Sequence, residues 1–291
     1  MFFPEIPASK VAGFIGLHKF QDQNEVFYDI LLKDKDVKAK IVEIETTHGR
    51  RSFSQVLNEV LRDSVVQDCV SAGIIAAQKT ADVSSVLADV EDKAKVILNL
   101  RRDTFTPELR TRLAEEIRGK VSKQRGLHNE NTILNNYETD RDVKVVERNT
   151  RTIKKAYENF AIVGRIDGFV ASENRIVDSK DRTKFWPTVP LYDEIQLRCY
   201  MDMTGATESE LVERFPDKTT RTTKFMNDAD KWKSLQDLME KNTTKLDAIV
   251  NNPEELKRMV FANTVCINQN GGSDILRAPS RIRKQTPTAN V

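Results

Sequence analysis

Two short apolar runs, each with an aspartate near its end, constrain the fold of this chain more than any other feature. The runs are IVGRIDGFV and NRIVDSK, and residues 172–174 make the turn between them. If the runs form one hairpin, Asp167 and Asp178 lie close together. Two buried like charges repel each other strongly unless a cation lies between them. The pattern predicts a hairpin with a divalent metal ion bound between these carboxylates.

A lysine and a helix extend this pattern. Asp178 and Lys180 are two residues apart on the predicted strand, so both side chains point to the same face. Metal-assisted phosphodiester hydrolysis requires a hard cation with oxygen ligands and an amine that can hold or polarise a water molecule. In the following segment, YDEIQLRCYMDM, Gln196 and Tyr200 are four residues apart and share one face of a predicted helix.

Three motifs in this region resemble a known superfamily. They are G-x-x-D at residues 164–167, D-x-K at residues 178–180 and Q-x-x-x-Y at residues 196–200. Although D-x-K alone occurs by chance in most proteins of this size, the three together and in this order resemble the PD-(D/E)xK nucleases, in the RecB-like, YqaJ and lambda-exonuclease-like branch. The resemblance implies an α/β fold with a restriction-endonuclease-like core, in which helices flank a central mixed β-sheet, plus a helical insertion here.

The resemblance also implies an activity and a set of site residues. The activity is that of a metal-dependent DNA nuclease, above all an exonuclease that processes duplex DNA ends in recombination, repair or replication. The residues implied to be catalytic are Asp167, Asp178, Lys180, Gln196 and Tyr200. Glu130, in the G-x-x-x-E element of residues 126–130, and the carbonyl of Ser179 would join Asp167 and Asp178 as ligands of Mg²⁺, for which Mn²⁺ can substitute.

Five further residues are candidates for DNA contacts: Ser9, Arg165, Arg182, Lys184 and Trp186. The segment around Ser9 resembles the N-terminal segment of the YqaJ family, where the matching serine lies in a pocket for a 5′-phosphate. The arginine that the family carries a few residues earlier is missing from MFFPEIP, so the polarity of cleavage stays open. Ser9 could instead cap a helix, and Trp186 could serve packing alone.

Composition narrows the class of protein. The 291 residues carry a net charge of +2, and no apolar run is long enough to span a bilayer. The start of the chain lacks the pattern of a signal peptide, so we expect a soluble intracellular protein. Its three cysteines are far apart, which excludes a zinc ribbon, a disulfide framework and an iron–sulfur cluster held by four cysteines.

The hydrophobic pattern divides the chain into four segments. These are an N-terminal part of the nuclease domain (residues 1–50), a helical insertion (51–120), the nuclease core (121–265) and a flexible basic tail (266–291). Within them we predict a helix at 25–33, a strand at 34–48, helices from 51 to 119, a strand block from 142 to 180, a helix at 191–203, a hairpin turning at 216–218 and a long helix at 228–250. One helix of the 51–119 segment starts at Thr106-Pro107-Glu108, which supply a cap, a proline for the first turn and an acid that suits the helix dipole. Residues 101–125 hold eight Lys or Arg against four acids and could contribute to a DNA groove.

Other functions remain open at this point. The same motifs suit a structure- or site-specific endonuclease, and the fold can serve as a non-catalytic DNA-binding module. A helical scaffold protein, in which the strand block is incidental, is a third class. The expected partner is DNA, as duplex ends or single strands, with no membrane. The family adds a single-strand annealing protein or a helicase as partners, and closed rings as a form of homo-oligomer.

Overall fold

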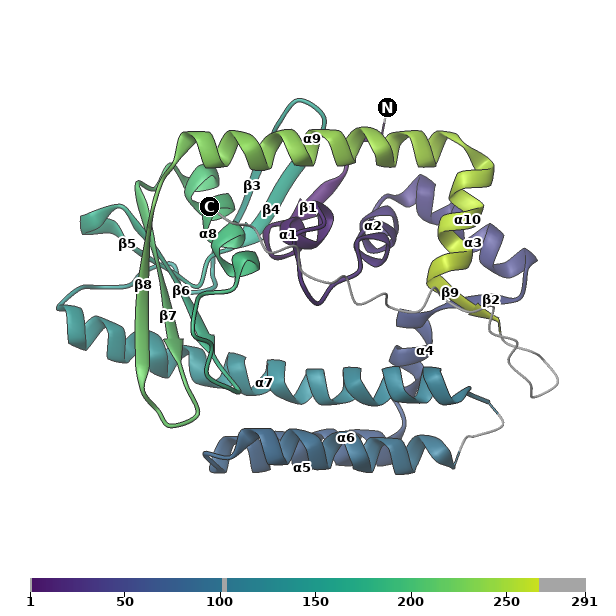
Figure 1. Ribbon diagram of the computed structural model, residues 1–291, viewed down its shortest axis with the longest axis horizontal. Helices are drawn as coiled ribbons and strands as arrows, with labels where there is room; N and C mark the ends of the chain where they lie inside the picture. Colours follow the sequence, from purple (N-terminus) through teal and green to yellow (C-terminus); the bar gives the residue numbers. More distant parts are fainter. Residues whose placement is uncertain (1, 101–103, 267–291) are drawn as a thin grey trace, which may run out of the picture.

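The structure, a computed structural model, describes residues 2–100 and 104–266 and has an α/β fold (Figure 1). Its α-helices are α1 (Val11–Phe14), α2 (Gln23–Leu31), α3 (Lys35–Thr47), α4 (Phe53–Val60), α5 (Ser64–Lys79), α6 (Val83–Asn99), α7 (Pro107–Arg141), α8 (Leu191–Thr204), α9 (Ala229–Asn251) and α10 (Pro253–Asn263). Two short 3-10 helices are η1 (Ala8–Lys10) and η2 (Ala171–Glu173). Apart from Cys266, the predicted basic tail at residues 266–291 lies outside the described residues.

The strands of the described residues form three sheets, where the sequence predicts one central sheet. A mixed three-stranded sheet has the order β1-β4-β3 and consists of β1 (Glu5–Pro7), β4 (Ala161–Arg165) and β3 (Thr152–Ala156). A mixed four-stranded sheet consists, in spatial order, of β5 (Gly168–Val170), β6 (Arg175–Asp181), β7 (Glu208–Arg214) and β8 (Thr220–Met226). The third sheet pairs β2 (Arg50–Ser52) with β9 (Thr264–Cys266).

The chain passes from one mixed sheet to the other at Asp167. The sequence predicts one strand over residues 162–170, but β4 pairs with β1 and β3, whereas β5 pairs with β6. The free edge of β5 is occupied by the preceding segment, because the backbone of Val146 bonds to that of Phe169. The predicted hairpin exists between β5 and β6, and Asn174 ends its turn in a left-handed conformation. Asp167 therefore lies at the junction of two sheets.

Helix α8 connects the parallel strands β6 and β7 and so completes a βαβ unit. Ile176 of β6 belongs to the hydrophobic cluster that α8 joins, whereas Val177 packs with residues of α7. Alternate side chains of a strand point to opposite faces, so the even-numbered residues of β6 face α8. Asp178 and Lys180 share this face, in agreement with the sequence prediction.

The segment at residues 34–48 is a helix, α3, and the predicted strand there is wrong. The carboxylate of Asp34 accepts hydrogen bonds from two backbone N–H groups of the first turn, which caps the helix. The buried positions are Val37, Ile41 and Glu45, four residues apart, whereas a strand would also have buried Ala39, which is exposed. The apolar residues alternate with charged ones over only a short stretch, and the four-residue period decides the structure.

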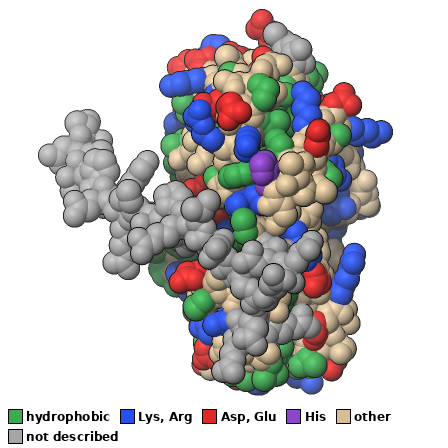
Figure 2. All heavy atoms as spheres, turned by 90° about the vertical axis from the view of Figure 1, so that its right-hand side faces the viewer, with side chains coloured by type: hydrophobic (Ala, Val, Ile, Leu, Met, Phe, Trp, Pro, Cys, Tyr) green, Lys and Arg blue, Asp and Glu red, His purple; other side chains and the backbone are tan. Residues whose placement is uncertain are grey.

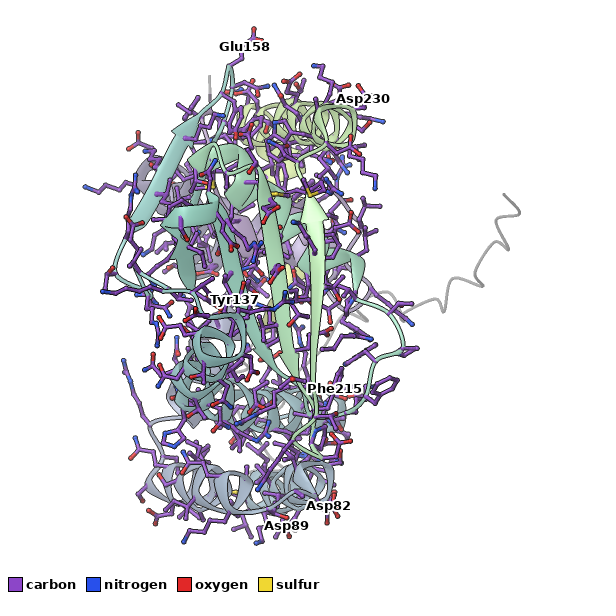
Figure 3. The ribbon with its side chains drawn as sticks, turned by 90° about the vertical axis from the view of Figure 1, so that its left-hand side faces the viewer. Asp82, Asp89, Tyr137, Glu158, Phe215 and Asp230 are labelled. Carbon is purple, nitrogen blue, oxygen red and sulfur yellow. The ribbon has the colours of Figure 1, made fainter. Side chains whose placement is uncertain are left out.

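The other predicted elements after residue 180 and the helices before α7 are present, as is the start of α7 at Thr106, whose side chain caps the helix ahead of Pro107. The segment at 142–150 contains only the isolated bridge at Val146. Helices α5 and α6 lie beneath α7 on the side away from the sheets (Figure 1), and α4–α7 form a hydrophobic cluster of their own. Helix α7 continues past residue 120 to the four-stranded sheet, where Tyr137 lies between helix and strands (Figure 3).

Charge is dispersed over the face that carries α3 and α10. Where Figure 2 leaves the described residues in view, positive and negative side chains are interspersed. Among the described residues, no helix combines the length and the hydropathy that crossing a bilayer requires.

Candidate active site

The structure brings Asp167 and Asp178 together as the sequence predicts. One carboxylate oxygen of Asp167, Oδ2, accepts hydrogen bonds from the backbone N–H of Ser179 (2.9 Å) and from its hydroxyl (3.3 Å). Asp178 lies in the middle of β6, opposite Leu211 of β7, and is only 1% exposed. Its Oδ1 atom is buried and has no hydrogen-bond partner among the described residues. A carboxylate oxygen buried in this way is costly unless another group is bound there.

Lys180 shares the site with this pair. Its Nζ lies 2.6 Å from Oδ2 of Asp178, and its side chain keeps 26% of its surface exposed. The ammonium group thus reaches from the buried carboxylate toward solvent. Since both residues project from the same face of β6, the contact follows directly from the two-residue spacing.

The electrostatics of the cluster are those of buried carboxylates held near one ammonium group. Burial raises the pKa of Asp178 to about 7, and the charge of Asp167 adds to this effect while Lys180 opposes it. Burial likewise raises the pKa of Asp167. For Lys180, burial lowers the pKa, but the carboxylates of Asp178, Asp167 and Asp193 outweigh this effect and the pKa is raised. Lys180 therefore remains an ammonium ion at neutral pH.

Gln196 and Tyr200 connect α8 to the end of β4. The hydroxyl of Tyr200 donates to the backbone carbonyl of Arg165 (2.9 Å), and Nε2 of Gln196 donates to the same hydroxyl (3.0 Å). The glycine of the G-x-x-D motif permits this approach, because a Cβ on Gly164 would lie 2.6 Å from Cε1 of Tyr200 and 3.1 Å from the Cβ of Ala8. The two motifs thus meet, and their contact fixes the backbone just before Asp167.

Glu130 lies near the carboxylate pair but is not joined to it. Burial raises the pKa of Glu130, a hydrogen bond from Asn149 lowers it, and the charge of Asp178 raises it further. The carboxylates of Glu130 and Asp178 therefore interact electrostatically. In the described part of the chain, however, no three His, Cys, Asp or Glu side chains converge as a metal site would require. Glu130 belongs to α7, whereas Asp178 faces α8. The side-chain amide of Asn149 donates a hydrogen bond to Oε1 of Glu130.

Of the five predicted DNA contacts, three are exposed, one is half-buried and one is buried. Ser9, Arg165 and Lys184 are exposed, and Trp186 is half-buried. Ser9 lies within η1 and caps neither η1 nor α1. The ammonium of Lys184 lies 4.6 Å from the ring centroid of Trp186.

Arg182 requires a correction, because its guanidinium is buried and paired within the protein. It lies 2.7 Å from carboxylate oxygens of both Asp193 and Glu213. Two ion pairs and 9% exposure leave it no access to a DNA backbone. Arg182 instead ties the end of β6 to the start of α8 and to β7.

The sequence did not indicate the acidic residues that pair with the buried arginines. Asp193 and Glu213 carry no motif, and only a three-dimensional contact reveals their roles. Asp181 is similar: its side chain is fully buried and lies 2.7 Å from Nη1 of Arg125 and 3.1 Å from Nε of Arg214. The only available signal was that Asp181 directly follows the D-x-K motif, on the opposite face of β6.

Comparisons with known proteins gave matches to solved structures alone. No family model matches the chain, and no curated protein matches it. An alkaline exonuclease from Laribacter hongkongensis is 18% identical, with 54% of this chain and 89% of that chain covered and a TM-score of 0.38. The structure of that exonuclease in complex with dAMP is 16% identical, with 65% of this chain and 90% of that chain covered and a TM-score of 0.38. A phage-related exonuclease from Haemophilus somnus 129PT is 14% identical, covering 47% and 73%, with a TM-score of 0.36.

Proposed function

We propose that this protein is a metal-dependent deoxyribonuclease, specifically an exonuclease that processes duplex DNA ends. The observation that carries the proposal is the buried carboxylate of Asp178, with one unpartnered oxygen, beside Asp167 and Lys180. Such a cluster destabilises the fold, because burial and like charge both oppose ionisation. A function is therefore a better explanation of it than packing.

The donor set suits a hard divalent cation. Asp167 and Asp178 supply carboxylate oxygens, the ligands that Mg²⁺ and Mn²⁺ prefer, and the free Oδ1 of Asp178 is the atom most in need of a cation. The Ser179 carbonyl completes the proposed set, and Glu130 joins it only by giving up its bond to Asn149. A bound Mg²⁺ would lower the pKa of a water molecule and stabilise the charge that develops on the phosphate.

The side chains of the chain have separate tasks in this proposal. Lys180 stays charged, so it orients the attacking water and balances negative charge near the scissile phosphate, and it does not act as a general base. Tyr200 donates to the Arg165 carbonyl and accepts a hydrogen bond from Gln196, which fixes the backbone just before Asp167. The exposed side chains of Arg165 and Lys184 are the proposed phosphate contacts.

The test is cleavage of end-labelled linear duplex DNA in Mg²⁺ by the wild type and by Lys180→Ala. The expected result is a loss of about 10²- to 10³-fold in kcat for this variant. Lys38→Ala, at an exposed lysine on α3, is the control and keeps full activity. Mn²⁺ should replace Mg²⁺, whereas Ca²⁺ should permit binding without cleavage. If wild type and Lys180→Ala leave the duplex equally intact in both metals, the proposal is wrong.

Covalently closed circular DNA separates the two nuclease classes. An exonuclease requires an end and leaves the circle intact, whereas a structure- or site-specific endonuclease of the same superfamily linearises it. Cleavage of the circle at the rate seen for the linear duplex would therefore retain the nuclease and reject its dependence on ends.

One observation favours a second candidate, a non-catalytic DNA-binding module on the same fold. In the residues that the structure describes, the three predicted acidic ligands do not converge. Under this alternative, labelled duplex binds with the same affinity in EDTA and in Mg²⁺, and it remains intact in Mn²⁺. Calorimetry with Mg²⁺ and no DNA then gives no binding heat, whereas the nuclease should bind the ion.

A further inference from the structure

Four aromatic rings gather beside the proposed active site, from three separate segments. His18 stacks on Tyr192 with ring centroids 4.3 Å apart and an interplanar angle of 22°. Phe20 meets the edges of Trp186 at 6.1 Å and of Tyr192 at 6.3 Å. His18 and Phe20 follow α1, Trp186 lies in the connection after β6, and Tyr192 is in the first turn of α8. We call these four residues the aromatic cluster.

The aromatic cluster is open to solvent and carries positive charge at its rim. Phe20 is 55% exposed, and the other three rings are half-buried. Nζ of Lys19 lies 5.8 Å from the centroid of Phe20, and Nζ of Lys184 lies 4.6 Å from that of Trp186. Aromatic faces next to ammonium groups suit a ligand that has flat rings and negative charge.

Hydrogen bonds hold the aromatic cluster in place. Nη1 of Arg221 donates to the backbone carbonyls of Trp186 (2.8 Å) and Pro187 (3.0 Å). The backbone N–H of Phe20 donates to Nδ1 of His18 (3.1 Å). These bonds fix the two loops that carry the rings, so a ligand would lose little entropy in ordering them.

Helix α8 links the aromatic cluster to the carboxylate pair. Tyr192, Gln196 and Tyr200 are spaced by four residues and therefore follow one face of the helix. Tyr200 is buried in the core, whereas Tyr192 is half-buried and lies close enough to Lys180 to interact with its charge. The aromatic cluster therefore lies at the solvent-exposed end of this face, beside Lys180.

We propose that the aromatic cluster binds unpaired nucleobases, so that a single-stranded segment lies at the start of α8, beside the carboxylate pair. Bases stack on aromatic side chains whatever their sequence, and the rim lysines contact the phosphates. A hydrophobic protein partner is less suitable, because it would leave both ammonium groups without anionic partners. The position relative to the cut depends on the proposed nuclease function, whereas the binding itself does not.

The binding test uses fluorescence anisotropy with labelled single-stranded DNA, in EDTA and in the Lys180→Ala background so that no cleavage occurs. Phe20→Ala and Trp186→Ala should each weaken binding about tenfold, and change the binding of a blunt duplex less than twofold. The control is Phe185→Ala, which removes a 66% exposed ring of the same loop. The ring of Phe185 packs on Phe215, with centroids 5.0 Å apart, and does not belong to the aromatic cluster. Equal losses for all three variants, or no loss for any, would overturn the proposal.

Two further measurements sharpen the result. Phe20→Leu keeps an apolar side chain but cannot stack, so it should lose as much single-strand affinity as Phe20→Ala; wild-type affinity would contradict stacking. On duplexes with single-stranded overhangs of increasing length, the Phe20→Ala variant should lose no affinity for blunt ends and should lose affinity once an overhang is present. A loss that is the same for blunt ends would contradict the inferred position.

The outcomes also separate this inference from the proposed function. If wild-type protein cleaves no DNA but its binding of single strands depends on Phe20 and Trp186, the aromatic cluster stands as a binding site and the nuclease fails. If the protein cleaves DNA and both variants bind single strands normally, the nuclease stands and the inference fails.

Discussion

Replacement of Asp178 by Asn should stabilise the metal-free protein at alkaline pH. Asp178 is buried beside Asp167, and its pKa in the folded protein is raised from 3.8 to about 7. Ionisation of this carboxyl therefore lowers the free energy of unfolding of the wild type. The amide of Asn has about the same shape and does not ionise, so the variant avoids this loss. Most substitutions of buried residues destabilise a protein, so the sign of this effect is distinctive.

The magnitude follows from the pKa. Because the raised pKa means that the folded state binds the proton more tightly, stability falls as the pH rises from the unfolded value toward 7. Three pH units at about 1.4 kcal/mol each give up to about 4 kcal/mol of difference between Asp178→Asn and the wild type. Between pH 5 and pH 8 the difference should widen by about 3 kcal/mol, and above pH 8 it should stay constant.

The assay is urea denaturation in EDTA across this pH range, for the wild type, Asp178→Asn and Asp68→Asn. Asp68 is an exposed aspartate on α5, and its replacement should leave the pH dependence unchanged. With Mg²⁺ at a hundred times its Kd, the wild type should gain about 2.7 kcal/mol and Asp178→Asn should gain far less. A variant less stable than the wild type at pH 8, or a difference that does not widen with pH, would refute the reasoning.

Two other substitutions test contacts around the site. Gly164→Ala should lower the free energy of unfolding by about 1–3 kcal/mol and reduce nuclease activity, because the new Cβ would lie 2.6 Å from the buried ring of Tyr200. Urea midpoints and initial rates measure these effects. The control Gly126→Ala, with open space around its Cβ, should be neutral or slightly stabilising. Arg125→Met should cost about 3–5 kcal/mol in unfolding free energy, because Asp181 stays buried without one of its cations, and Arg125→Lys should restore part of this loss; equal midpoints for both variants and the wild type would contradict that role of the ion pair.

Sequence alone was sufficient wherever the relevant contact is set by local geometry. Asp178 and Lys180 meet because two residues on a strand share a face, and Gln196 and Tyr200 bond because four residues on a helix do. The start of α7 at Thr106 and Pro107 was predictable for the same reason, since a cap needs only its own first turn. The strand prediction at residues 34–48 failed because a short alternating pattern also fits a helix whose buried residues recur every four positions.

Tertiary structure decided everything that depends on partners distant in sequence. Arg182, the basic residue after the D-x-K motif, is buried because it forms ion pairs with Asp193 of α8 and Glu213 of β7. Glu130 took Asn149 as its partner and stayed apart from the carboxylate pair. No local period encodes such pairings, because the energy of an ion pair depends on which charges the folded chain places within a few ångströms of each other and on how much water it removes from them.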